Sequence, residues 1–153
     1  MPRWMGALGS RRVGSEIGKA TLQSLAQEKL EDATALVGDN RWSNGYYLAG
    51  YAVELALKAC IAKAFKAETI PDRNLVNATY QHNFKNLVGT AGLSAELRNK
   101  EQADAGFAAN WGVVNSWSPD ARYASATEQD AKELLRAISD EKDGVFEWIK
   151  VFW

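Results

Sequence analysis

The feature that most constrains this chain is an apolar stretch covering residues 42–65. It contains no proline, and its many Ala, Leu and Lys residues favour a helix. Between positions 46 and 62 the only charged side chains are Glu54 and Lys58. A helix that is apolar on all sides is buried on all sides, so we expect other elements to surround this one.

The two charges in this helix are informative because burying a charge is costly unless it is paired. Glu54 precedes Lys58 by four residues, which is the favourable order for an ion pair on a helix. Two interpretations follow. The side chains reach an edge of the bundle or pair with each other or with a neighbour, or they line a polar seam that belongs to a functional site.

Composition limits the class of protein. A chain of 153 residues is long enough for one domain with a substantial core. Its formal net charge of −1 argues against a broadly cationic nucleic-acid surface, although it allows a local basic groove. The single cysteine, Cys60, cannot form an internal disulfide and is expected to be an inert core residue. With no long apolar run at the start and two charges inside the central stretch, we expect a cytoplasmic protein without a membrane span.

The hydrophobic periodicity predicts helices and no strand. We expect residues 1–14 to be a flexible tail, or alternatively a basic arm that contacts phosphate, and residues 15–153 to form one domain. The predicted elements are helices over 15–37 and 42–65, a loop over 67–81, a short helix over 82–88, a long helix over 94–117, a loop over 118–125 and a final helix. The final helix is expected to begin with a capping box at Ser125–Glu128 and to have a kink or break near Lys142–Gly144. The short turn at 38–40 makes the first two helices antiparallel neighbours. The predicted fold is therefore all-α, an antiparallel bundle of four long helices plus a short one.

Three segments in order resemble a known family. They are NGYYLAGYAVELALKA at 44–59, then His82 with Phe84 and Leu87, and then WSPDARY at 117–123 before a last helix. This pattern resembles the HEPN domains, named for higher eukaryotes and prokaryotes nucleotide-binding, over residues 20–150. The resemblance implies a helical bundle that forms a homodimer and acts on or near RNA or nucleotides. Many such domains are encoded beside a minimal nucleotidyltransferase as toxin–antitoxin pairs.

The sequence departs from the signature of the active ribonucleases in that family, which is an arginine, four to six intervening residues and a histidine. The only histidine is His82, and eight residues separate it from Arg73, the nearest arginine before it. The positions that follow Arg122 at a matching distance, 127–129, hold no histidine. We therefore expect a module that does not cleave RNA by that mechanism.

The candidate nucleotide- or RNA-binding residues are Arg41, His82, Asn115, Arg122 and Tyr123. An arginine beside an aromatic residue, just before a helix N-terminus, can hold a phosphate and stack on a base. In the alternative, Tyr123 packs under its loop and Arg122 pairs with a neighbouring aspartate. For His82 the alternative is a structural residue at a loop-to-helix junction that caps the helix or bonds to backbone.

Other chemistries lack support in the sequence. No cluster has metal-ligand spacing, and no Gly-rich phosphate loop or G-x-S-x-G motif occurs, so we expect no metal and no cofactor. The favoured function is a non-catalytic, homodimeric HEPN-like module that binds nucleotide, RNA or a minimal nucleotidyltransferase protein. One alternative is a metal-independent ribonuclease toxin that uses His82 with Arg122 or Arg41. Another is a structural module that docks a protein through an exposed apolar patch around Trp148, Phe152 and Trp153.

Overall fold

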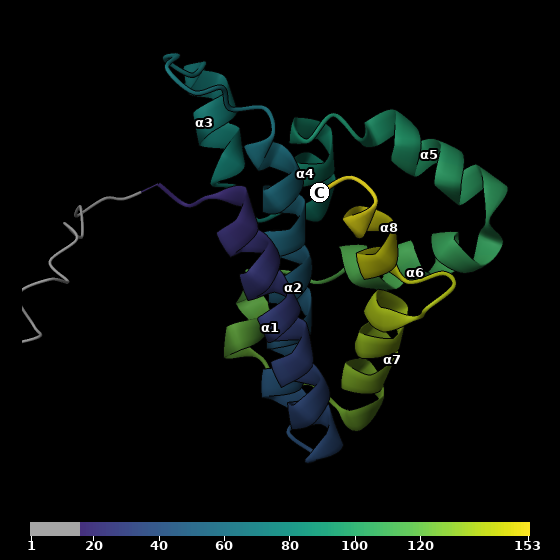
Figure 1. The fold of residues 1–153 in the computed structure, drawn as a ribbon. Coiled ribbons are helices and arrows are strands. Elements are labelled where there is room, and N and C mark those ends of the chain that lie inside the picture. Colours follow the sequence, from purple (N-terminus) through teal and green to yellow (C-terminus); the bar gives the residue numbers. More distant parts are fainter. Residues whose placement is uncertain (1–15) are drawn as a thin grey trace, which may run out of the picture.

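The computed structural model describes residues 16–153, so the predicted tail at 1–14 lies outside the described residues. Within that range every regular element is a helix, which confirms the all-α prediction (Figure 1). The elements are α1 (Lys19–Gly38), α2 (Trp42–Ala62), α3 (Arg73–Thr79), α4 (Phe84–Thr90), α5 (Ser94–Ala103), α6 (Ala105–Asn115), the 3-10 helix η2 (Pro119–Tyr123), α7 (Glu128–Ser139) and α8 (Val145–Lys150).

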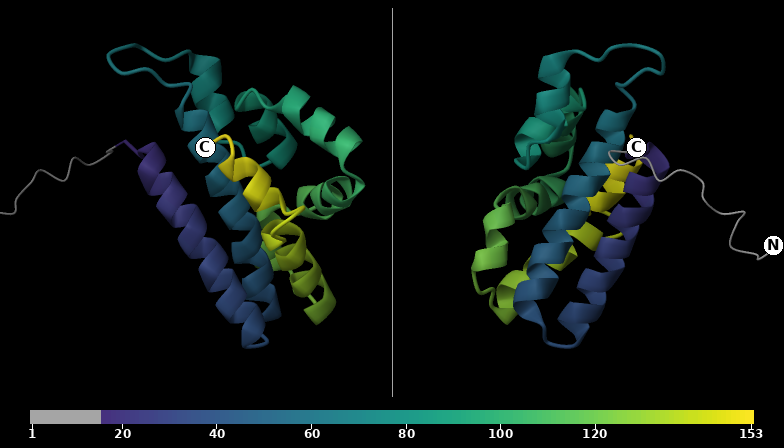
Figure 2. Two further views of the ribbon diagram at one scale, coloured as in Figure 1. Left: turned by 45° about the vertical axis from the view of Figure 1, so that its right-hand side comes forward. Right: turned by 90° about the vertical axis from the view of Figure 1, so that its left-hand side faces the viewer.

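Helices α1 and α2 form an antiparallel hairpin, as predicted (Figure 2). The turn between them includes Asn40, whose φ of 61° lies in the left-handed region that Asn tolerates better than most residues. Gly45 lies against Val37, where an added Cβ would come within 2.7 Å of a side-chain methyl group. The absence of a side chain at Gly45 therefore lets the two helices approach closely.

Helix α2 is the centre of the molecule, because α1, α4, η2, α7 and α8 all pack against it. Its interior residues have no exposed surface over several turns, including Ala49, Val53, Ala56 and Leu57. This confirms the prediction that the apolar stretch is a buried helix. No helix among residues 16–153 combines the length and the hydropathy that a membrane crossing requires.

The predicted loop over 67–81 contains a helix, so that prediction is wrong over Arg73–Thr79. The signal was present in the sequence, because Asp72 is the N-cap and its side chain accepts a hydrogen bond from Leu75 N at 3.0 Å. Pro71 and Asp72 favour a loop in the sequence, but the same residue types also start helices.

The predicted long helix over 94–117 is two helices that meet at Asp104, which corrects the expectation of four long helices. Asp104 has an extended backbone (φ −142°, ψ 102°), and its side chain caps α6 by accepting from Phe107 N at 3.0 Å. An aspartate side chain competes with the helical backbone for hydrogen bonds, and here it interrupts the helix.

The last helix is also divided, into α7 and α8, as the residues around Lys142–Gly144 indicated. The capping box at its start lies two residues later than predicted. Thr127 accepts from Asp130 N at 3.1 Å, and Asp130 accepts from Thr127 N at 3.0 Å, so the box does not use Ser125 and Glu128.

Candidate functional site

A buried carboxylate lies at the centre of the candidate site. Glu54 on α2 is only 2% exposed, and its Oε1 lies 2.8 Å from Nδ1 of His82. Its other oxygen, Oε2, lies 3.5 Å from Nζ of Lys58 one turn along α2. Glu54 is therefore paired with its neighbours, as the first interpretation of the two charges expects, and His82 is its second partner. A functional role for this polar seam stays a prediction.

His82 precedes α4 and is held by Glu54 rather than by backbone. The N-cap of α4 is Asn83, whose side chain accepts from Asn86 N at 3.0 Å, so capping is not the role of His82. Because a carboxylate only accepts, Nδ1 carries the hydrogen and donates it to Glu54. In the neutral ring Nε2 is then the basic nitrogen, and the imidazole side chain is 58% exposed.

Lys58 differs from His82 in its surroundings, since its side chain is only 15% exposed. One buried carboxylate thus faces two basic groups, one almost enclosed and one at the surface. The formal charges of Glu54 and Lys58 cancel, so the imidazole of His82 is the exposed polar group of the cluster.

A row of aromatic rings extends from this cluster. Tyr51 stacks on Tyr47 with 6.1 Å between ring centroids, Tyr47 lies 6.1 Å from Trp117, and Trp117 stacks on Phe84 at 5.2 Å. Burial, and then the charge of Glu54, raise the pKa of the Tyr51 phenol. The row joins α2, α4 and the segment that leads into η2.

Arg122 and Tyr123 lie at the end of η2. The Tyr123 ring is 80% exposed, so it does not pack under the loop, and the guanidinium carbon of Arg122 lies 5.0 Å from the ring centroid. This distance is within the range of a cation–π contact. Among the ion pairs within residues 16–153 there is none between Arg122 and Asp120.

The remaining predicted residues lie apart from the His82 cluster. Arg41 is exposed just before α2 and lines a shallow hollow of about 280 Å³. Along a helix, its separation from Glu54 corresponds to roughly 20 Å. Asn115 is exposed at the end of α6. A second hollow of about 350 Å³, between α2 and η2, is lined by Asp120 and Asp130 and by no basic residue.

The link between His82 and Glu54 was missed at the level of sequence, although both residues were singled out. The only histidine and the only acid in the apolar helix are 28 positions apart, and periodicity does not relate residues at that distance. Tyr47 and Tyr51 were also missed as site residues. Their place on the same helical stripe as Glu54 and Lys58 was the available signal.

Comparison of the chain with protein-family models, curated proteins and solved structures gave no match. The HEPN resemblance therefore stays a prediction. Within the described residues, no group of three His, Cys, Asp or Glu side chains has the geometry to hold a metal ion. What the site offers is two basic groups beside stacked aromatic rings, together with an open arginine–tyrosine pair.

Proposed function

We propose that this protein is an HEPN-like module, without the Arg–His ribonuclease signature, that binds single-stranded RNA or nucleotides. The observation that carries the proposal is the pair of Arg122 and Tyr123. An 80% exposed tyrosine with an arginine over its ring buries little surface, so packing against the core does not explain it. Such a pair is suited to an unpaired base and its phosphate.

The Glu54–His82–Lys58 cluster supports the same proposal from another part of the α2 surface. Helix α4, which follows His82, and η2 both pack on α2 (Figure 2), and Trp117 joins them through its contacts with Phe84 and Tyr47. Single strands are bound by aromatic platforms combined with cations that follow the backbone. In the aromatic row the half-buried rings of Tyr47 and Tyr51 could take this role, because Trp117 and Phe84 are buried.

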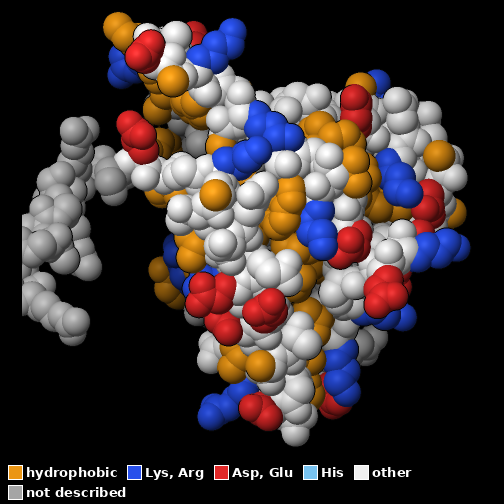
Figure 3. All heavy atoms as spheres, in the orientation of Figure 1, with side chains coloured by type: hydrophobic (Ala, Val, Ile, Leu, Met, Phe, Trp, Pro, Cys, Tyr) orange, Lys and Arg blue, Asp and Glu red, His pale blue; other side chains and the backbone are white. Residues whose placement is uncertain are grey.

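The charge distribution favours a local contact over a broad one. On the face shown in Figure 3, basic and acidic side chains are interspersed, without a continuous basic surface. Binding that relies on a few cations depends on salt, with a slope in log K against log salt that reflects the number of phosphates neutralised. We expect a shallow slope, corresponding to one to three phosphates by this relation.

The test is fluorescence anisotropy with a labelled single-stranded RNA and a matched duplex. Replacing Tyr123 by alanine should weaken single-strand binding by about 10- to 100-fold, because stacking on one ring contributes roughly 1–3 kcal/mol. Arg122→Gln should weaken binding and reduce the salt slope by about one. Arg98→Gln, at an exposed arginine of α5, is the matched control and should change neither the affinity for RNA nor the salt slope. A parent protein that binds no RNA and no nucleotide, or variants that bind as the parent does, would contradict the proposal.

A second candidate function, metal-independent RNA cleavage by a toxin, is favoured by one specific contact. The Glu54–His82 hydrogen bond orients the imidazole so that Nε2 can accept a proton from a ribose 2′-hydroxyl, with a nearby cation to stabilise the phosphate. His82→Gln should then abolish cleavage of a fluorescent RNA while leaving RNA affinity within a few-fold of the parent. Cleavage that persists in this variant would eliminate His82 as the base.

The homodimer and the nucleotidyltransferase partner are further parts of the proposal. Light scattering of the purified protein, alone and mixed with such a partner, tests both, and a strict monomer would contradict the dimer. A docking role through the C-terminal rings has less support. Trp148 is buried, and Phe152 and Trp153 pack against the core, so these rings do not form an exposed patch.

A further inference from the structure

His82 presents one ring nitrogen to a buried carboxylate and leaves the other nitrogen open. Nδ1 lies 2.8 Å from Glu54 Oε1, and within residues 16–153 Nε2 takes part in no hydrogen bond. The imidazole side chain is 58% exposed, so a small molecule can reach Nε2. Because the two nitrogens lie on different sides of the ring, such a molecule approaches without displacing Glu54. An accessible imidazole nitrogen is a nucleophile as well as a base.

Glu54 is fixed behind the ring. It is 2% exposed, and its Oε2 lies 3.5 Å from Lys58 Nζ, so both of its oxygens are engaged. A carboxylate that accepts from one ring nitrogen fixes the tautomer in which the other nitrogen has the lone pair. It also stabilises positive charge that develops on the ring, as the aspartate of a serine hydrolase triad does. Glu54 is therefore a positioning residue for His82.

We propose that His82 is a nucleophile that accepts a phosphoryl group from an acyl phosphate onto Nε2. The lone pair of Nε2 attacks the phosphorus atom, and the bond between phosphorus and the acyl oxygen breaks. The donor leaves as a carboxylate with the electron pair of that bond. The ring becomes an imidazolium that keeps the Nδ1 proton, and Glu54 balances its charge. Nothing is oxidised or reduced, and the step does not depend on RNA binding.

The surroundings of His82 favour a donor with a single phosphate and a good leaving group. Transfer from a nucleoside triphosphate relies on cations that neutralise several phosphate oxygens. Lys58 is paired with Glu54, and none of the ion pairs within residues 16–153 brings an arginine to the cluster. An acyl phosphate fits these surroundings, because a carboxylate leaves readily without such a clamp.

Two neighbouring side chains that also accept phosphoryl groups are less available than His82. The thiol of Cys60 is buried, and burial raises its pKa to about 11, so little thiolate forms at neutral pH. The amine of Lys58 is paired with Glu54, and its side chain is only 15% exposed. His82 is the only histidine of the chain, so an adduct on an imidazole ring can come from no other residue.

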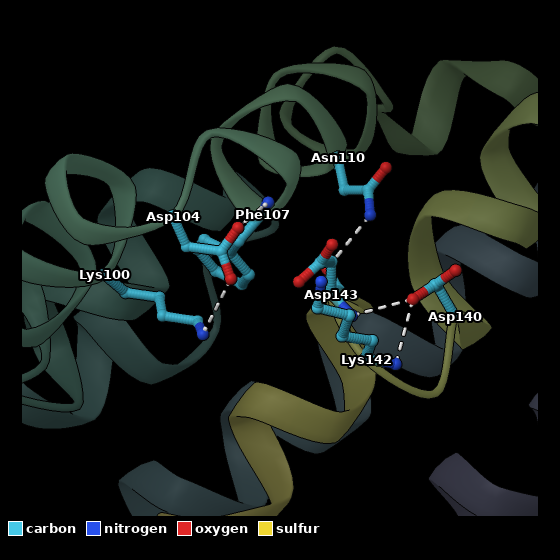
Figure 4. Close-up of polar contacts among 7 residues, drawn as sticks. All are labelled: Lys100, Asp104, Phe107, Asn110, Asp140, Lys142 and Asp143. Carbon is cyan, nitrogen blue, oxygen red and sulfur yellow. Dashed lines mark hydrogen bonds and ion pairs between the residues drawn. The ribbon is translucent and has the colours of Figure 1, made fainter.

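Aspartates accept phosphoryl groups in some enzymes, but those where α6 meets the α7–α8 loop are engaged in other contacts (Figure 4). Asp104 accepts from Phe107 N at 3.0 Å and from Lys100 Nζ at 3.2 Å. The backbone hydrogen bond, followed by the lysine, lowers the pKa of Asp104 to about 2, so its carboxylate is a weak nucleophile. Oδ1 of Asp140 accepts from two backbone amides of its own loop. These carboxylates hold the backbone in place.

Incubation of the full chain with acetyl phosphate, followed by intact-mass measurement and NMR of the adduct, tests the proposal. The parent should gain one phosphoryl group, bonded to Nε2 of His82 and labile in acid. It should react at least about ten-fold faster than a histidine in a short peptide, which is the scale of one charge-assisted hydrogen bond. His82→Gln should gain no acid-labile adduct of this kind.

The role of Glu54 is tested in the double variant Glu54→Gln with Lys58→Met, which leaves no unpaired charge in the cluster. Transfer should slow by about 10- to 100-fold, because the charge that stabilises the imidazolium is gone. Adducts should also appear on both ring nitrogens, because an amide either accepts from Nδ1 or donates to it. A merely structural role would leave the preference for Nε2 unchanged. Glu28→Gln, at an exposed position of α1, is the control and should behave as the parent.

The outcomes that would overturn the proposal are equally specific. A parent that reacts no faster than the peptide histidine would show that Glu54 does not activate the ring. An adduct on Nδ1 would contradict the tautomer that Glu54 imposes. A double variant that keeps both the rate and the Nε2 preference of the parent would exclude Glu54 as a positioning residue.

Discussion

Trp117 lies flat against α2 at Gly50, where an added Cβ would come within 2.1–2.2 Å of the indole ring. The ring cannot move aside, because Phe84 stacks on it at 5.2 Å and Tyr47 lies 6.1 Å away. Gly50→Ala gains about 1 kcal/mol of helix propensity. We expect overpacking to exceed this gain, so that the free energy of unfolding in urea falls by about 2 kcal/mol.

Gly112 provides the matched control for this substitution. It is also a helical glycine, but nothing lies within 4 Å of its added Cβ. Gly112→Ala should stabilise the protein by about 0.5–1 kcal/mol. Equal effects at the two sites would mean that Trp117 does not need the glycine at position 50.

Glu54 is the residue on which the charge balance of the site depends. Glu54→Gln keeps the shape but leaves the mostly buried Lys58 without its counter-charge. We expect a loss of roughly 2–3 kcal/mol in the free energy of unfolding, measured by urea denaturation. Adding Lys58→Met should recover most of it, because the unpaired charge is then gone. If the double variant instead loses the sum of the free energies of unfolding lost by Glu54→Gln and Lys58→Met separately, Glu54 and Lys58 are not coupled.

At the scale of elements, the ends of the helices were the least predictable feature. Asp104 divides a continuous apolar pattern into α5 and α6, and Asp72 starts α3 inside a predicted loop. Both act through one side-chain hydrogen bond to backbone. Periodicity reports which face of a helix is apolar, but an aspartate within the pattern is compatible with a solvent-facing position and with a cap.

The capping box of α7 gives a direct test at this scale. Thr127→Ala should cost about 1 kcal/mol, because it removes the acceptor for Asp130 N. Ser125→Ala, at the position favoured by the sequence pattern, should change stability by less than about 0.5 kcal/mol. The comparison is made by thermal and urea unfolding. A larger loss of stability for Ser125→Ala than for Thr127→Ala would mean that Ser125 is the N-cap of α7.

At the scale of the whole molecule, Cys60 reports on unfolding. Its thiol is 5% exposed between α2 and α8, with Sγ 3.8 Å from Ile149 O, and burial raises its pKa to about 11. At pH 8 a disulfide reagent should therefore react with the native protein only as fast as α8 leaves α2, and at once in denaturant. Rapid labelling of the native protein would show that this contact opens without global unfolding.

The sequence by itself determined the helical class, the buried central helix and the α1–α2 hairpin. These features follow from local properties, namely the spacing of apolar residues, the absence of proline in α2 and a short polar turn. It also singled out Glu54, Lys58, His82 and Arg122 as unusual. Only the tertiary structure decided that Glu54 bonds to His82 rather than serving Lys58 alone.

The tertiary structure likewise decided that Trp117 packs on Gly50 and that Asp143 lies against Gly106. Each of these contacts joins residues far apart in the chain, and each depends on how the helices pack in three dimensions. Hydrophobic periodicity specifies which face of an element is buried. It carries no information about which side chain of another element that face will meet.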